Sequence, residues 1–283
     1  MLGQHPELYG VPELNLFIAD SVGGMMDFFL SSKQRYRMHG LVRALAQLHD
    51  GEQTETTAQA AWEWLEQHRD WSSTKLAHYL AERVHPRGLT DKSPSNTRNL
   101  ACLDRLYAAF PQARILHLIR HPRSTGHSLY KVYAERRDFE RLKRRKSRKR
   151  FRSFDAKKIE RHWLETHQSI LHFTERLTLG QSMRLQGELL LSDPDTYLAQ
   201  ICRWLGVSTD AEALAAMKHP EQSPYAGFGP SNARGGNNRG FLEDPTLRIL
   251  KRRIIDLSGP LEWVTDSSGF CEETIRLAHQ FGY

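Results

Sequence analysis

An arginine and a serine eight residues apart form the first pattern in the sequence that could do chemistry. Arg120 follows the apolar run from Ala113 to Ile119, and Ser128 lies beyond the turn at Pro122. A guanidinium at the end of a buried strand can hold a phosphate through two hydrogen bonds, and a hydroxyl in the following helix can donate another. The same spacing fits an arginine that ends a strand at the surface and a serine on a helix face, so the spacing leaves both interpretations open.

The run before Arg120 is the clearest strand in the sequence. It is short, apolar and bounded by the turn FPQ and by His121-Pro122, and it is too short for a buried helix. We expect it to be central in a parallel sheet, with Ile115 to Ile119 buried on both faces. Ligands of open α/β sheets bind at the carboxyl ends of the strands, which is where Arg120 stands.

The remaining pattern alternates short strands with helices. Strands are expected at 88–93 and 183–190, and helices at 41–48, 58–68, 72–84, 99–110, 155–177, 196–205 and 271–281, with a further helix after 122. Asp193-Pro194 should open one helix and Gly206 close it. This order predicts an α/β fold with mostly parallel strands.

Chain length favours one elaborated domain over residues 1–283, because 283 residues with 39% hydrophobic side chains can bury one large core. Within it we distinguish a helical insert at 38–84, a basic helical stretch at 136–152 and a Gly/Asn-rich loop at 223–240. A long loop of that composition is either a lid over a site or a tether.

Composition narrows the setting of the protein. No apolar run approaches the roughly 20 residues that span a bilayer, and the three cysteines lie far apart, so we expect a cytoplasmic protein without a membrane segment, a metal or disulfides. The net charge of +7 comes from residues 136–152, which hold eleven Lys or Arg against two acidic residues. That stretch fits a solvated helix face, an anionic acceptor site or a nucleic-acid patch, and the lack of interleaved aromatic residues disfavours nucleic acid.

Five segments in chain order resemble motifs of one enzyme family. They are TDKSPSN at 90–96, FPQARILHLIRHPRSTGHSLY at 110–130, GELLLSDPDTYLAQICRWLGV at 187–207, GPSNARGGNNRGFLEDP at 229–245 and the terminal FGY. Over nearly its whole length the chain resembles sulfotransferases that use 3′-phosphoadenosine 5′-phosphosulfate, including bacterial and protein-tyrosine enzymes. The resemblance implies a three-layer, P-loop-NTPase-like fold with a mostly parallel central sheet, and this donor as co-substrate without a metal.

The resemblance also assigns roles to particular residues. It places Arg120 and Ser128 on the 3′-phosphate of the donor, and it makes Lys92 the catalytic ammonium near the leaving oxygen, where negative charge develops during transfer. Glu13, behind a proline turn, is the candidate base for the acceptor hydroxyl. The late loop adds Asn237, Asn238 and Arg239 as residues that could fold over the donor. His121 and His127 have neither the spacing nor the third carboxylate of a catalytic triad, so we expect them to be structural.

The sequence departs from the family at its beginning. Family members open with a strand and a loop reading roughly Pro-Arg-Ser-Gly-Thr, which holds the 5′-phosphosulfate, and no such text occurs in this chain. We therefore expect the first strand and the phosphate loop to be missing, through a misplaced start or a genuine truncation. The chain as written should then bind donor nucleotides weakly and transfer sulfate poorly, and a longer chain should recover both.

Two functions from different classes follow. The first is transfer of a sulfuryl group to a hydroxyl or amine of a small-molecule, saccharide or peptide acceptor. The alternative is a truncated, catalytically inactive relative that binds a nucleotide or a partner. A phosphate-loop kinase is disfavoured because the sequence contains no GxxxxGK[ST] motif. The acceptor's identity and the oligomeric state do not follow from the sequence.

Overall fold

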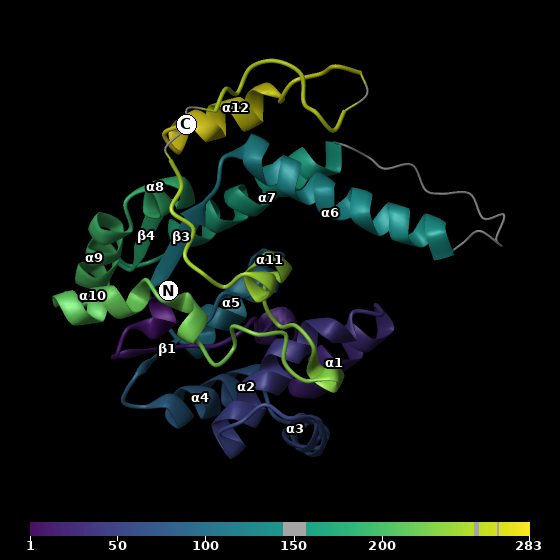
Figure 1. The fold of residues 1–283 in the computed structure, drawn as a ribbon, viewed down its shortest axis with the longest axis vertical. Coiled ribbons are helices and arrows are strands. Elements are labelled where there is room, and N and C mark those ends of the chain that lie inside the picture. Colours follow the sequence, from purple (N-terminus) through teal and green to yellow (C-terminus); the bar gives the residue numbers. More distant parts are fainter. Residues whose placement is uncertain (144–156, 252–254, 265) are drawn as a thin grey trace. The chain divides into compact units, whose positions relative to one another are not determined.

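Short strands alternate with many helices along the chain, as the sequence predicts for an α/β protein (Figure 1). The computed structural model describes residues 1–143, 157–251, 255–264 and 266–283. By its internal contacts the chain divides into two units. Unit 1 comprises Met1–Ile115, Thr178–Gln181 and Asp193–Ile249, and unit 2 comprises Leu116–Leu177, Ser182–Ser192 and Leu250–Tyr283. The single domain over 1–283 stays a prediction.

Unit 1 is mainly helical and contains one two-stranded sheet. Strand β1 (Leu8–Gly10) runs parallel to β2 (Gly88–Thr90), with Leu8 opposite Gly88 and Gly10 opposite Thr90. Its α-helices are α1 (Val22–Ser31), α2 (His39–Asp50), α3 (Glu55–Gln67), α4 (Ser73–Val84), α5 (Leu100–Ala109), α9 (Pro194–Leu205), α10 (Ala211–Met217) and α11 (Arg239–Glu243). Its 3-10 helices are η1 (Leu2–Gln4), η2 (Leu16–Ile18), η3 (Arg35–Met38), η4 (Pro94–Thr97), η5 (Pro220–Gln222) and η6 (Ser231–Ala233).

The predicted helical insert at 38–84 consists of α2, α3 and α4, which lie beside one another (Figure 1). Three of the helix ends have a local cause. The hydroxyl of Thr54 accepts a hydrogen bond from Thr57 N at the start of α3, and that of Ser72 does the same from Lys75 N at the start of α4. Gly51 ends α2 with a left-handed φ of 77°. Apolar residues of all three helices, including buried Leu45, supply most of the hydrophobic core of unit 1.

Unit 2 is built on the second two-stranded sheet. Strand β3 (Ile115–Ile119), whose first residue is counted in unit 1, neighbours β4 (Ser182–Gln186). The helices of this unit are α6 (Pro122–Lys143), α7 (Lys157–Thr174), α8 (Gly187–Ser192) and α12 (Glu272–Gln280). Its core joins Ile119 on β3, Trp163 on α7 and Phe281 after α12.

The expectation that β3 is central and buried on both faces is wrong in the described part of the chain. His117 and Ile119 are buried, but Leu118 on the opposite face is 51% exposed. Among the described residues β3 has β4 as its hydrogen-bonded neighbour, so it lies at an edge of a two-stranded sheet. The apolar run therefore marks a strand correctly without revealing how many strands pair with it.

Three other sequence expectations need adjustment. The strand expected at 183–190 ends at Gln186, because residues 187–192 form α8. The loop expected at 223–240 is irregular except for η6, and its last two residues begin α11. Of the basic stretch at 136–152, α6 covers the part up to Lys143, and residues 144–152 lie outside the described residues. No helix in the described ranges is long and apolar enough to cross a bilayer.

Candidate functional site

Lys92 and Glu13, the two residues predicted to carry chemistry, form an ion pair. The Nζ of Lys92 donates a hydrogen bond to Oε1 of Glu13. Lys92 follows β2 and Glu13 follows β1, and because these strands are parallel their carboxyl ends meet at one edge. The Lys92 side chain is 67% exposed and that of Glu13 is 19% exposed. The pair thus joins a sheltered carboxylate to an ammonium that faces solvent.

The residues around Lys92 explain why its side chain points outward. The carboxylate of Asp91 accepts hydrogen bonds from Leu14 N at 3.3 Å, Ser93 Oγ at 2.7 Å and Asn96 Nδ2 at 3.2 Å. These contacts tie the segment after β2 to the segment after β1. Lys92 takes no part in them, which leaves its ammonium beside Glu13.

Asn15 is a residue of this site that the sequence did not single out. It is buried, with a left-handed φ of 54°. Its amide N donates to Ser93 Oγ at 2.9 Å, its Oδ1 accepts from Ser95 Oγ at 2.6 Å, and its Nδ2 donates to the carbonyl of Arg37 at 2.8 Å. Asparagine is one of the few residues that tolerates this backbone conformation, and that preference was the signal that could have found it.

Two glycines fix the backbone of Glu13. A Cβ on Gly40 would lie 2.2 Å from the Glu13 carbonyl oxygen, and one on Gly236, where φ is 85°, would lie 2.5 Å from the Cα of Gly40. The Glu13 amide donates to the carbonyl of Gly236 at 2.7 Å. Side chains at either glycine would separate three backbones that touch. We call residues 13, 40 and 236 the glycine contact.

The loop at 223–240 is anchored to the helical insert. Buried Arg43 on α2 donates from Nη1 to the carbonyl of Gly235 at 2.5 Å and from Nε to Gln53 Oε1 at 2.6 Å. Burial lowers the pKa of Arg43 to about 10. The indole of Trp62 donates to the carbonyl of Asn232 at 3.3 Å. This segment is therefore held in place on α2 and α3.

The three loop residues predicted to cover the donor follow the glycine contact. Asn238 caps α11, where its Oδ1 accepts from Gly240 N at 2.9 Å, and Arg239 Nε donates to Glu243 Oε1 at 2.7 Å. Asn237 is half-buried and its side chain makes no hydrogen bond within the described ranges. All three lie in unit 1, as do Lys92 and Glu13. Their contact with a donor stays a prediction.

Arg120 and Ser128 lie in unit 2. Arg120 directly follows β3, and its exposed side chain makes no ion pair or hydrogen bond with a described residue. Ser128 is exposed, in the second turn of α6. Both are free to meet an anion. Because Lys92 and Arg120 belong to different units, their convergence on one cleft stays a prediction.

Side chains hold both polar groups of the peptide that follows Arg120. The indole Nε1 of Trp163 donates to the Arg120 carbonyl at 2.9 Å, and the His121 amide donates to Glu188 Oε1 at 2.9 Å. The hydroxyl of Tyr283 donates to Glu188 Oε2 at 2.8 Å. We call Trp163, Glu188 and Tyr283 the peptide clamp, because they fix the backbone from which the Arg120 side chain extends.

The two histidines near Arg120 have structural contacts. His121 is buried, burial lowers its pKa, and its Nδ1 accepts from the amide of Arg123 at 3.1 Å. His127 Nδ1 lies 2.7 Å from Glu262 Oε2 at the surface. In the described part of the chain no three His, Cys, Asp or Glu side chains gather as metal ligands would. The absence of a metal from the reaction stays a prediction.

Comparison with known proteins decides the family. A model of the sulfotransferase family matches residues 1–211. The chain belongs to the sulfotransferase family. The whole chain is similar in structure to the sulfotransferase domain from the Synechococcus PCC 7002 olefin synthase, with a TM-score of 0.71, 26% sequence identity and 88% of that domain covered. It is also similar to a sulfotransferase domain from the curacin biosynthetic pathway, with a TM-score of 0.69, 21% identity and 91% covered. No curated protein matches the chain.

These matches confirm the predicted fold class. The sulfotransferase chain has the α/β, P-loop-like fold of its structural neighbours, with the parallel pair β1 and β2 in unit 1. The matched region contains the Lys92–Glu13 pair, Arg120 and Ser128. The match ends before residues 237–239, which lie at the start of α11.

Proposed function

We propose that this sulfotransferase moves a sulfuryl group from 3′-phosphoadenosine 5′-phosphosulfate to a hydroxyl or amine of its acceptor. The observation that carries the proposal is the ion pair of Lys92 with Glu13 beyond the parallel strands β1 and β2. An in-line sulfuryl transfer needs a base at the attacking oxygen and a cation at the leaving oxygen, and the pair contains one group of each kind.

Each member of the pair has one task. The Glu13 carboxylate accepts the proton of the acceptor hydroxyl as the new O–S bond forms. The S–O bond to the nucleotide phosphate breaks, and the Lys92 ammonium neutralises the charge that collects on the leaving oxygen. Lys92 is 67% exposed, so its flexible side chain can turn from Glu13 toward that oxygen.

The residues proposed to hold the donor suit an anionic nucleotide. The Arg120 guanidinium is exposed and unpaired among the described residues, and its backbone is fixed by the peptide clamp. It would grip the 3′-phosphate bidentately, with the Ser128 hydroxyl as a further donor. Of the three loop residues, Asn237 has a side chain free to reach the donor, whereas Asn238 and Arg239 already have partners in α11.

Donor binding tests the phosphate assignment. The chain is titrated with 3′-phosphoadenosine 5′-phosphate in a calorimeter, with Arg120→Ala beside Arg161→Ala, an exposed arginine on α7 of the same unit. Loss of charge-assisted hydrogen bonds to a phosphate should weaken binding about 10- to 100-fold in Arg120→Ala. Arg161→Ala should bind as the parent does. Equal affinities in the two variants would overturn the assignment.

Transfer of radiolabelled sulfate tests the chemistry. Lys92→Ala and Glu13→Gln should each lower kcat by about 10²- to 10³-fold while the affinity for the nucleotide changes little. Undiminished turnover in both variants would refute the roles given to the pair. Nucleotide binding without transfer to any hydroxyl or amine would identify the noncatalytic alternative.

A further inference from the structure

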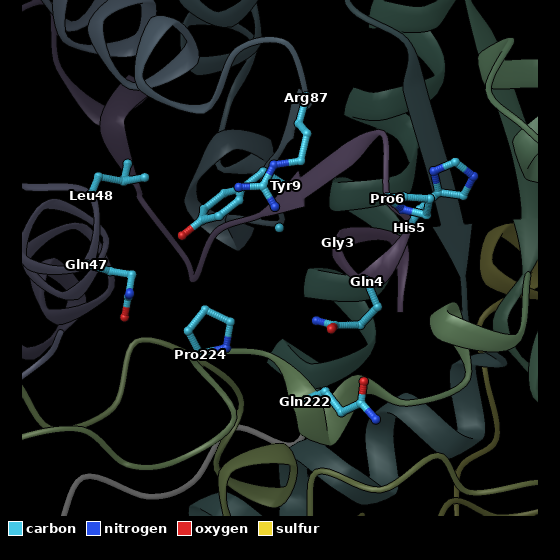
Figure 2. A pocket seen from close by; sticks show the side chains of 11 residues that line it. Gly3, Gln4, His5, Pro6, Tyr9, Gln47, Leu48, Arg87, Gln222 and Pro224 are labelled. Atoms are coloured by element: carbon cyan, nitrogen blue, oxygen red, sulfur yellow. The ribbon is translucent and has the colours of Figure 1, made fainter. Parts of the chain in front are cut away.

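A pocket of about 490 Å³ opens in unit 1 and has no part in the roles assigned so far (Figure 2). Its walls come from the segment before β1, from β1 itself, from the end of α2, from Arg87 and from residues 222–224. Its volume lies within the range of about 300–1,000 Å³ that is usual for small-molecule sites.

The wall of this pocket is polar and carries a single charge. It contains the carboxamides of Gln4, Gln47 and Gln222 and the guanidinium of Arg87, and no aspartate or glutamate. The imidazole of His5 also lines the pocket, but its two nitrogens are occupied by Ser208 O and Glu7 N. The pocket therefore presents positive charge together with amide donors and acceptors.

Arg87 is positioned by an aromatic ring and not by an acidic partner among the described residues. Its guanidinium lies beside the ring of Tyr9 in Figure 2. The guanidinium carbon is 4.5 Å from the ring centroid. The Tyr9 hydroxyl lies 3.0 Å from that of Tyr225, which is buried. Arg87 forms no ion pair with any residue in the described ranges. A stacked guanidinium keeps its outer edge free for bidentate hydrogen bonds to a planar or tetrahedral oxyanion.

The pocket and Glu13 of the Lys92–Glu13 pair are both close to strand β1 in the chain. Tyr9 and Gly10 of β1 line the pocket, and Glu13 lies three residues further along the chain. Three residues span at most about 11 Å. A molecule whose hydroxyl meets Glu13 can thus extend along β1 and place a second group against Arg87.

We propose that this pocket binds an anionic end, a carboxylate or a phosphate, of the acceptor. The inference rests on the proposed function, because it names the class of acceptor that the Lys92–Glu13 pair would sulfate. The glutamine carboxamides bind its polar groups, and Arg87 binds its oxyanion.

Binding of three matched probes to the full chain tests the pocket. The probes are 6-hydroxyhexanoate, 6-hydroxyhexyl phosphate and neutral 1,6-hexanediol, titrated at one fixed ionic strength and followed by calorimetry. Both anions should bind, and the diol should bind at least about tenfold more weakly. The ratio of the two anion affinities tells whether a carboxylate or a phosphate is the natural group.

Arginine variants identify the residue responsible. Arg87→Gln should weaken binding of the anions about 10- to 100-fold. The affinity of Arg87→Lys should lie between those of the parent and Arg87→Gln, because lysine keeps the charge and loses the bidentate hydrogen bonds of the guanidinium. Arg83→Gln is the matched control, since Arg83 also stacks on a tyrosine, at 5.1 Å from the Tyr79 ring, and lies outside the pocket. The control should bind the anions as the parent does.

The outcomes separate this inference from the proposed function. If the diol binds as tightly as the anions, or if Arg87→Gln behaves like Arg83→Gln, the pocket is not an oxyanion site even where donor binding and transfer are intact. If the anions bind in an Arg87-dependent manner but no donor nucleotide binds, the pocket stands and the proposed function fails. In a transfer assay with 6-hydroxyhexanoate, Arg87→Gln should raise KM and leave kcat nearly unchanged.

Discussion

Replacing Asn15 should destabilise the two segments that carry Glu13 and Lys92. Its side chain makes two short hydrogen bonds, from Ser95 Oγ at 2.6 Å and to the carbonyl of Arg37 at 2.8 Å, and a longer one to the carbonyl of Glu13 at 3.4 Å. In Asn15→Gly these side-chain hydrogen bonds are lost, while the left-handed backbone remains easy to adopt. Each lost bond costs on the order of 1 kcal/mol, and leaving the buried partners unsatisfied adds about as much again. The free energy of unfolding of unit 1 should fall by about 2–4 kcal/mol.

Asn15→Ala should be less stable still. It loses the same bonds, and its Cβ must also occupy a φ of 54°, which adds roughly 1 kcal/mol. Lys33 provides the matched control, because it is exposed with a φ of 56°. The difference in the free energy of unfolding between Lys33→Ala and Lys33→Gly measures the cost of a Cβ at a left-handed φ. The same difference is expected between Asn15→Ala and Asn15→Gly, and the destabilisation that Asn15→Gly itself shows is then assigned to the lost hydrogen bonds.

Urea unfolding followed by circular dichroism gives the stability changes, and amide hydrogen exchange places them in the chain. The Asn15 amide, which donates to Ser93 Oγ, should lose protection in both Asn15 variants and keep it in both Lys33 variants. A stability of Asn15→Gly within about 0.5 kcal/mol of the parent would refute the reasoning, since such a change is typical of surface sites without structural roles.

Three further outcomes follow from contacts described above. Gly236→Ala should disrupt the glycine contact and lower stability by several kcal/mol, whereas Gly51→Ala, with a similar φ of 77° and open space around it, should lose only about 1 kcal/mol in thermal unfolding. Buried His117 and His167 are in contact, with Nε2 of the first 2.8 Å from Nδ1 of the second, and burial lowers their pKa values from 6.5 to about 3 and about 4. Because the unfolded chain therefore binds more protons in acid, the free energy of unfolding should be highest above pH 6.5 and should fall as the pH drops toward 4. His167→Gln should show a weaker dependence on pH. Tyr283→Phe should reduce protection of the amide held by the peptide clamp, measured by hydrogen exchange, and a protection equal to that of the parent would argue against the clamp.

Features with local causes were predictable from the sequence. Asp193-Pro194 and Gly206 bound α9 as expected, because a side-chain cap, a fixed proline φ and a left-handed glycine all act within one turn. Ser72 caps α4 for the same reason. The apolar run at 115–119 forms a strand, but the exposure of Leu118 depends on which strands pair with β3, and no local pattern encodes that.

The candidate site was predictable by residue type and not by arrangement. The sequence singles out Lys92 and Glu13 separately, and they meet only because β1 and β2 pair in parallel. Asn15 escaped notice because its partners, Arg37 and Ser95, are distant in the chain and one of them offers only a carbonyl. The strand expected at 183–190 failed in its second half because Glu188 and the leucines after it favour helix intrinsically.

The glycine contact also sets an order of events during synthesis. The amide of Glu13 is synthesised 223 residues before its acceptor, the carbonyl of Gly236. At about 5–20 residues per second, the nascent chain waits roughly 10–45 s between the two. During that interval Gly40 faces no loop, and the Glu13 amide lacks its hydrogen bond to residue 236. The backbone of Glu13 therefore gains this contact only after residue 236 has emerged from the ribosome.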